Sequence, residues 1–115
     1  MLFDTKQKGL NTLFKPYQII ILHYLWDENK VKEGGINSAQ AFSYLEQFPE
    51  RKSRAAVINF MNAMVTEGIL TCKSESCKGG YRRIYNPAMN ETDFAEYICN
   101  IINIKLRDVF PNIFT

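Results

Sequence analysis

The stretch RKSRAAVINFMNAMVTEGIL (residues 51–70) decides what kind of fold this chain can form. It carries apolar residues at the i, i+3, i+4, i+7 spacing of one helical face. These residues are Val57, Phe60, Met61 and Met64. Ser53 is suited to begin the helix as its N-cap, and Gly68 is suited to end it. The stretch therefore predicts a helix with one buried face, followed directly by a β-strand.

Two more helices are predicted before this stretch. The segment FKPYQIIILHYLWDEN (residues 14–29) begins well because Pro16 suits the first helical turn, and it is apolar nearly all round. Asn37 is predicted to cap a second helix, with Gln40 as its reciprocal partner, and Pro49 to end it. Residues 1–13 are predicted to form a short preliminary helix.

The segment after residue 68 changes to strand-like composition. Residues 69–74 and 81–85 surround a Gly-Gly tip and predict a β-hairpin, which Pro87 ends. Ile36 could add a very short strand, and Asn90 is predicted to cap a last helix.

The predicted fold class is mainly α with a small β-hairpin. Its order, with two short helices joined by a tight turn and followed by a two-stranded wing, is that of a winged helix-turn-helix. We expect residues 1–87 to form this DNA-binding domain and residues 88–115 to form a C-terminal dimerisation helix.

Length and composition favour one soluble domain. The chain has 115 residues, 46% of them hydrophobic, which is enough for a buried core. Its longest apolar run, IIILHYLW (residues 19–26), is too short to span a bilayer, so no membrane partner is expected. The N-terminus does not resemble a signal peptide, and three cysteines are few for a secreted scaffold. A cytoplasmic location is therefore expected.

Charge is unevenly distributed along the chain. Residues 51–83 hold seven Lys and Arg against two Glu, a net charge of +5, whereas the remainder carries −3. Such a division within one small domain suggests a face made for a polyanion. The alternative is an ordinary solvated surface.

The outward side of the helix within residues 51–70 carries side chains that can contact bases. In helix-turn-helix proteins the second helix of the motif lies in the major groove. There Arg can bind guanine, Asn can bind adenine and an apolar side chain can meet a thymine methyl group. The predicted base-contacting residues are Arg54, Ala55, Ile58, Asn59 and Asn62. Arg51, Lys52 and Ser53 are expected at phosphates. The alternative is that these side chains are merely solvated.

Basic residues also flank the hairpin tip. Lys73, Lys78, Arg82 and Arg83 could contact the DNA backbone, although Arg82 and Arg83 cannot both face it in a regular strand. These charges could instead protect the hairpin edge from pairing with another strand. Ile84 and Tyr85 are expected to pack back onto the domain.

The last helix carries more apolar residues than a small domain needs. A second copy of the chain could cover this surplus, and a homodimer would place two recognition helices about 34 Å apart. The predicted interface residues are Phe94, Tyr97, Ile98, Ile101, Ile102, Ile104, Leu106 and Val109. The alternative is a helix folded over its own core.

Catalytic and metal-binding motifs are missing from the sequence. It has no phosphate-binding loop, dinucleotide fingerprint or nucleophile elbow. His23 is the single histidine, and Cys72, Cys77 and Cys99 do not have the spacing of a zinc site. We expect no enzymatic activity, no metal and no cofactor. A redox role of the cysteines stays open.

Residues 15–87 resemble the winged-helix transcriptional regulators, most closely the penicillinase-repressor-like group and next the MarR-like group. The resemblance is carried by YQIIILHYLWDEN, SRAAVINFMNAMVTEGIL and YRRIYNP. It implies a cytoplasmic homodimer that represses transcription by covering a palindromic operator in double-stranded DNA. Whether a small-molecule effector binds is not indicated by the sequence. The alternative is a winged-helix protein-interaction module within a transcription or replication assembly.

Overall fold

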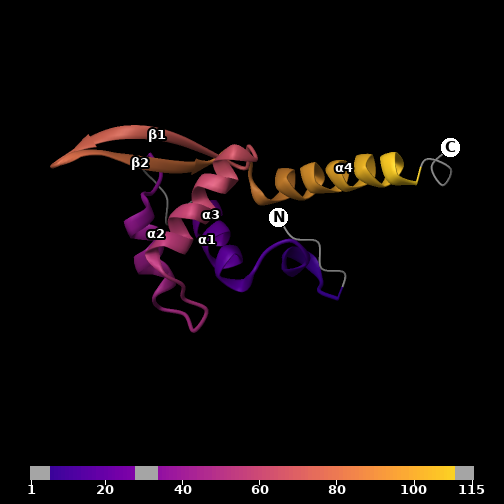
Figure 1. Ribbon diagram of the computed structural model, residues 1–115, viewed down its shortest axis with the longest axis horizontal. Coiled ribbons are helices and arrows are strands. Elements are labelled where there is room, and N and C mark those ends of the chain that lie inside the picture. Colours follow the sequence, from indigo (N-terminus) through magenta and orange to yellow (C-terminus); the bar gives the residue numbers. More distant parts are fainter. Residues whose placement is uncertain (1–5, 28–33, 111–115) are drawn as a thin grey trace.

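The computed structural model describes residues 6–27 and 34–110. Its elements are η1 (Gly9–Thr12), α1 (Pro16–Trp26), α2 (Ser38–Leu45), α3 (Arg54–Thr66), β1 (Leu70–Cys77), β2 (Gly80–Pro87) and α4 (Glu91–Val109). The described chain is thus mostly helical with one antiparallel hairpin, as predicted (Figure 1). The preliminary helix expected over residues 1–13 is the short 3₁₀ turn η1, and residues 1–5 lie outside the described part.

The predicted N-caps are confirmed, and they explain where the helices begin. The Asn37 side chain accepts a hydrogen bond from the Gln40 backbone N–H at 2.9 Å, and Gln40 Oε1 accepts from the Asn37 N–H at 2.8 Å. Ser53 Oγ accepts from the Ala56 N–H at 3.2 Å. Asn90 Oδ1 accepts from the N–H of Asp93 at 2.7 Å. Each cap satisfies a backbone donor that has no partner within the helix.

The end of α2 differs from the prediction. The helix stops at Leu45, four residues before Pro49. The backbone N–H groups of Gln47 and Phe48 bond to the carbonyls three residues earlier, at 3.3 and 3.1 Å. These tighter 3₁₀-type bonds end the α-helix before the proline is reached.

The core lies between α1, α2, α3 and the start of α4. The predicted inner face of α3 is confirmed, since Val57, Phe60, Met61 and Met64 are all buried. The Phe14 ring centroid lies 6.1 Å from that of Phe60 and 5.8 Å from that of Phe94. In α1, adjacent Ile21 and Leu22 are both fully buried, so this helix is covered on two sides as its composition predicted.

The hairpin joins the body through Tyr85. The Ile36 N–H donates to the Tyr85 carbonyl at 3.0 Å and the Tyr85 N–H donates to the Ile36 carbonyl at 2.7 Å, which confirms the short strand at Ile36. Gly35 has φ +97°, and a Cβ there would collide with the Tyr85 carbonyl oxygen. A glycine is therefore required at this point. Both strands are longer than predicted, and Ile84 and Tyr85 are buried as expected.

The part of α4 from Phe94 to Ile102 packs on the core described above. Phe94 and Ile98 are buried there, and Trp26 Nε1 donates to the Met89 carbonyl at 3.0 Å. The helix then extends away from the body, on the side of α3 opposite to the hairpin in Figure 1. The start of α4 therefore belongs to the same core as the preceding residues.

Candidate nucleic-acid interface

The outward side of α3 is open to solvent along its first turns. Arg54, Ala55 and Asn59 are exposed, and Ile58 and Asn62 are half-buried. The Asn59 amide has no hydrogen-bond partner among the residues described here. These five predicted base-contacting residues thus lie away from the core face, and neither Arg54 nor Asn59 has a side-chain hydrogen bond to another described residue.

The residues before α3 place two positive charges next to its N-terminus. Arg51, Lys52 and Ser53 are all exposed. The Lys52 ammonium lies 5.9 Å from the centroid of the Tyr17 ring, a cation–π distance that directs this side chain toward α1. The Ser53 hydroxyl accepts the α3 cap bond, so it keeps only its own O–H to offer a phosphate.

Asn62 differs from the other four residues because its oxygen already has partners. Asn62 Oδ1 accepts a hydrogen bond from Arg83 Nη1 at 3.0 Å and another from the Tyr85 hydroxyl at 2.6 Å. The sequence did not reveal this Asn62–Arg83–Tyr85 cluster, because the three residues are brought together only by the angle between hairpin and helix. The cluster joins the outer side of α3 to one face of the hairpin.

The two faces of the hairpin carry different charges. Arg82 and Arg83 point to opposite faces, as the alternation predicted. Arg83 shares its face with Tyr85 and adjoins α3, whereas Arg82 lies on the other face with Lys73. Arg82 Nη2 also lies 3.2 Å from Glu75 Oε1, so its charge is paired. The α3-side face of the hairpin therefore offers Arg83 but neither Arg82 nor Lys73. Lys78 is exposed in the turn at the tip.

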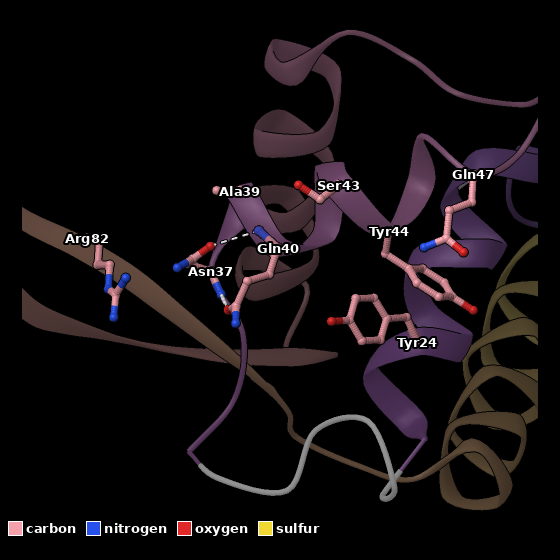
Figure 2. Close-up of a pocket in the computed structure, with 8 residues that line it drawn as sticks. All are labelled: Tyr24, Asn37, Ala39, Gln40, Ser43, Tyr44, Gln47 and Arg82. Atoms are coloured by element: carbon pink, nitrogen blue, oxygen red, sulfur yellow. Dashed lines mark hydrogen bonds between the residues drawn. The ribbon is translucent and has the colours of Figure 1, made fainter.

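Arg82 instead borders an open groove beside α2. Figure 2 shows the hairpin side chain of Arg82 at one end of this groove and Tyr24 and Tyr44 at the other, their ring centroids 4.2 Å apart. Asn37 and Gln40 lie between them and are used in the α2 cap. The amides of Asn37 and Gln40 are therefore already engaged, while Ser43 and Gln47 also line the groove.

A second groove lies directly beside the outer side of α3. Its base is apolar and comes from α1, from α3 and from Phe14 just before α1, and Asn59 and Gln18 are among the polar residues that line it. The apolar residues at its base are Phe14, Tyr17, Phe60 and Met64. Because the base is part of the core, Asn59 stands on a rigid support rather than on a loop.

The predicted dimer interface divides into a buried and an open part. Phe94 is 1% and Ile98 is 6% exposed within a single chain, so neither has surface to offer a second copy. Tyr97 is half-buried, and its hydroxyl donates to the Glu67 carbonyl at 3.3 Å. Ile101 and Ile102 are half-buried as well.

The remaining interface residues are open to solvent. Ile104 is 57%, Leu106 is 37% and Val109 is 67% exposed, and Phe110, which the sequence-based set did not include, is 50% exposed. The apolar surface left without cover is therefore the second half of α4.

Within residues 6–27 and 34–110, no three His, Cys, Asp or Glu side chains are grouped to hold a metal ion. Cys72, Cys77 and Cys99 are free thiols. Burial raises the pKa of the Tyr85 phenol, Cys72 adds to the rise, and Arg83 lowers that pKa. Across the same residues, no helix combines the length and apolar character that crossing a membrane requires.

Comparisons with protein-family models, with curated proteins and with solved structures find no match to this chain. Inferences about function therefore start from the α3 surface, the hairpin and α4.

Proposed function

We propose that this chain is a sequence-specific double-stranded DNA-binding protein that regulates transcription, as a repressor, in the manner of a winged helix-turn-helix. One observation supports this most strongly. The outer side of α3 continues through the Asn62–Arg83–Tyr85 cluster onto one face of the hairpin. Exposed cations lie at both ends of this surface, at Arg51 before α3 and at Lys78 in the tip. A helix beside a basic hairpin is suited to a major groove and its flanking phosphates.

The proposed contacts on α3 follow from side-chain chemistry. Arg54 would donate two hydrogen bonds to guanine O6 and N7, and Asn59, whose amide is unoccupied within the described residues, would bind adenine. Ala55 and Ile58 are small and apolar, which suits contact with thymine methyl groups. Arg51, Lys52 and Lys78 would bind phosphates and fix the orientation of the helix on the duplex.

We further propose that the protein acts as a homodimer on a palindromic operator. The support is the exposed apolar second half of α4, formed by Ile104, Leu106, Val109 and Phe110. Such an area is best removed from water by another apolar surface. An isologous contact between two identical patches gives a two-fold axis, and two-fold symmetric proteins bind two-fold symmetric DNA sites.

The cytoplasm is the proposed location, because free cysteines persist in a reducing compartment. Catalysis is not part of the proposal, since the described residues show no grouped ligands for a metal and no nucleophile paired with a base.

Selection of bound duplexes from a random DNA pool tests the proposal. We expect the wild-type protein to enrich a two-fold symmetric sequence. Arg54→Ala and Asn59→Ala should each relax one pair of symmetric positions, by about 1–3 kcal/mol of discrimination per site. Lys105→Ala, an exposed cation on α4, is the control and should leave the selected sequence unchanged. Enrichment of no sequence, or a selected sequence that both α3 substitutions leave intact, would contradict the proposal.

A second candidate function is a winged-helix protein-interaction module in a transcription or replication assembly. The same exposed second half of α4 favours it, because a different protein could cover this surface. Heparin retention and a mobility shift on random duplex DNA at low salt separate the two functions. Failure of both would favour the interaction module.

A further inference from the structure

The side-chain amide of Asn62 accepts hydrogen bonds through its oxygen Oδ1, whereas its NH₂ group donates none within the described residues. A guanidinium group has no acceptor, so the amide atom that lies 3.0 Å from Arg83 Nη1 must be the oxygen. The Tyr85 hydroxyl lies 2.6 Å from the same oxygen and must donate to it. Two donors fill the two lone pairs of Oδ1. Within the described part of the chain, the Nδ2 group donates to no acceptor.

The orientation of this amide is fixed by the body of the protein. Tyr85 is 2% exposed, and its backbone is bonded in both directions to Ile36. Burial raises the pKa of the Tyr85 phenol, so the phenol stays protonated and remains a donor at neutral pH. Rotation of the amide would place Nδ2 against the Arg83 guanidinium, which has no acceptor, so the hydrogen bond to Arg83 would be lost.

Resting on the proposed function, we infer that Asn62 contacts DNA as a hydrogen-bond donor alone, at a guanine edge. The usual pairing of Asn with adenine needs both amide atoms, because Oδ1 accepts from adenine N6 while Nδ2 donates to N7. Asn62 cannot supply that acceptor while Arg83 and Tyr85 hold its oxygen. Guanine presents two neighbouring acceptors in the major groove, O6 and N7, and these suit a lone NH₂ group.

Asn59 provides the contrast within the same helix. It is exposed and shares no hydrogen bond with the hairpin within the described residues, so its amide can turn to meet adenine. Two asparagines three residues apart on α3 would therefore recognise different bases, because the hairpin holds one of them.

The test replaces the NH₂ group of Asn62 with a carboxylate oxygen and keeps the Asn62–Arg83–Tyr85 contacts. Asn62→Asp retains an oxygen for Arg83 and Tyr85 but turns a second oxygen outward, and a carboxylate accepts a hydrogen bond from cytosine N4. Selection from a random DNA pool should show guanine at one pair of symmetric positions for the wild type. For Asn62→Asp the preference at those positions should change to cytosine, by about tenfold.

Two further variants make the outcome specific to the cluster. Asn59→Asp adds the same charge to the same helix and should alter a different base pair. Tyr85→Phe removes one donor from the Asn62 oxygen, and it should admit adenine at the positions that Asn62→Asp changes. Circular dichroism confirms that each variant is folded before selection.

Four results would overturn the inference. Adenine at those positions for the wild type would show that the oxygen is available. A loss with Asn62→Asp that is equal for every sequence would place Asn62 at a phosphate instead. An unchanged selection with Asn62→Asp would remove Asn62 from the interface while leaving the proposed function standing. A wild-type protein that binds no duplex DNA at all would overturn the proposed function, and the inference with it.

Discussion

α3 and α4 are both amphipathic helices that begin at a side-chain cap, yet they end in different surroundings. The apolar face of α3 is buried along its whole length, from Val57 to Met64. Phe94 and Ile98 of α4 are buried, whereas Ile104 and Val109, farther along the helix, are exposed to solvent. One helix is completed by its own chain, whereas the other keeps an apolar surface beyond the domain. The difference explains why we propose DNA binding for the outer side of α3, whose inner side is buried, and dimerisation for α4, whose end keeps exposed apolar side chains.

The largest expected effect is the difference in unfolding free energy between substitutions in the first and the second half of α4. Phe94→Ala should lower the free energy of unfolding by about 3–5 kcal/mol, because it empties a buried ring site against Phe14 and Trp26. Ile104→Ala should change it by no more than about 0.5 kcal/mol when the protein is too dilute to associate. Urea unfolding followed by circular dichroism measures both. Equal losses of unfolding free energy would show that both halves of α4 pack on the core to the same extent.

We expect dimerisation to depend on the second half of α4. Replacing Ile104 and Val109 together by Lys places like charges on the proposed contact, and we expect dimerisation to weaken by about a hundredfold or more. Asn103→Lys is the matched control, because it adds a charge to an exposed polar position of the same helix. Size-exclusion chromatography with light scattering gives the mass. A wild-type monomer, or a dimer that survives the double substitution, would contradict the account of α4.

Removing the N-caps of α3 and α4 should have a smaller effect on the free energy of unfolding. It tests whether the two helices unfold together as one cooperative unit. Ser53→Ala removes the bond to the Ala56 N–H and should lower the free energy of unfolding by about 1 kcal/mol. Asn90→Ala removes the bond to the Asp93 N–H and should cost about the same. If Asn90→Ala left unfolding unchanged while Ser53→Ala did not, α4 would unfold independently of the core that contains α3.

The smallest effect concerns the Tyr85 phenol that joins α3 to the hairpin. Burial raises its pKa above the ordinary value of about 10, so the folded chain holds this proton to higher pH than the unfolded chain does. The folded state then binds more protons, and its stability falls as the pH rises above about 10. Denaturant unfolding from pH 8 to 11 should show a smaller decline for Tyr85→Phe than for the wild type. An identical decline would mean that the phenol is not buried in solution.

Much of this fold could be predicted from the sequence because its signals are local. The caps at Asn37, Ser53 and Asn90 and the helical spacing of the α3 core depend on residues within one or two turns of each other. The end of α2 was misjudged because Pro49 is a strong local signal, while the 3₁₀ bonds at Gln47 and Phe48 depend on how the chain turns back toward α3.

The candidate interface was predictable in composition but not in detail. Helical spacing identified the outward side of α3, and strand alternation separated Arg82 from Arg83. Sequence spacing could not show that Asn62 meets Arg83 and Tyr85, because these contacts cross 21 and 23 residues of chain and depend on the hairpin angle. For the same reason, the sequence could not tell that Phe94 and Ile98 face the core while Ile104 and Val109 do not.

The central claim is that duplex DNA binds to the side of the molecule formed by α3 and the hairpin, and not to α4. Its most direct test is the affinity for a duplex as a function of salt, measured for the wild type, Lys78→Ala and Lys105→Ala. We predict that wild-type affinity falls steeply with salt, that Lys78→Ala reduces the slope of log affinity against log salt by about one, and that Lys105→Ala leaves the slope unchanged. A slope near zero for the wild type, or a change with Lys105→Ala but not with Lys78→Ala, would contradict the account.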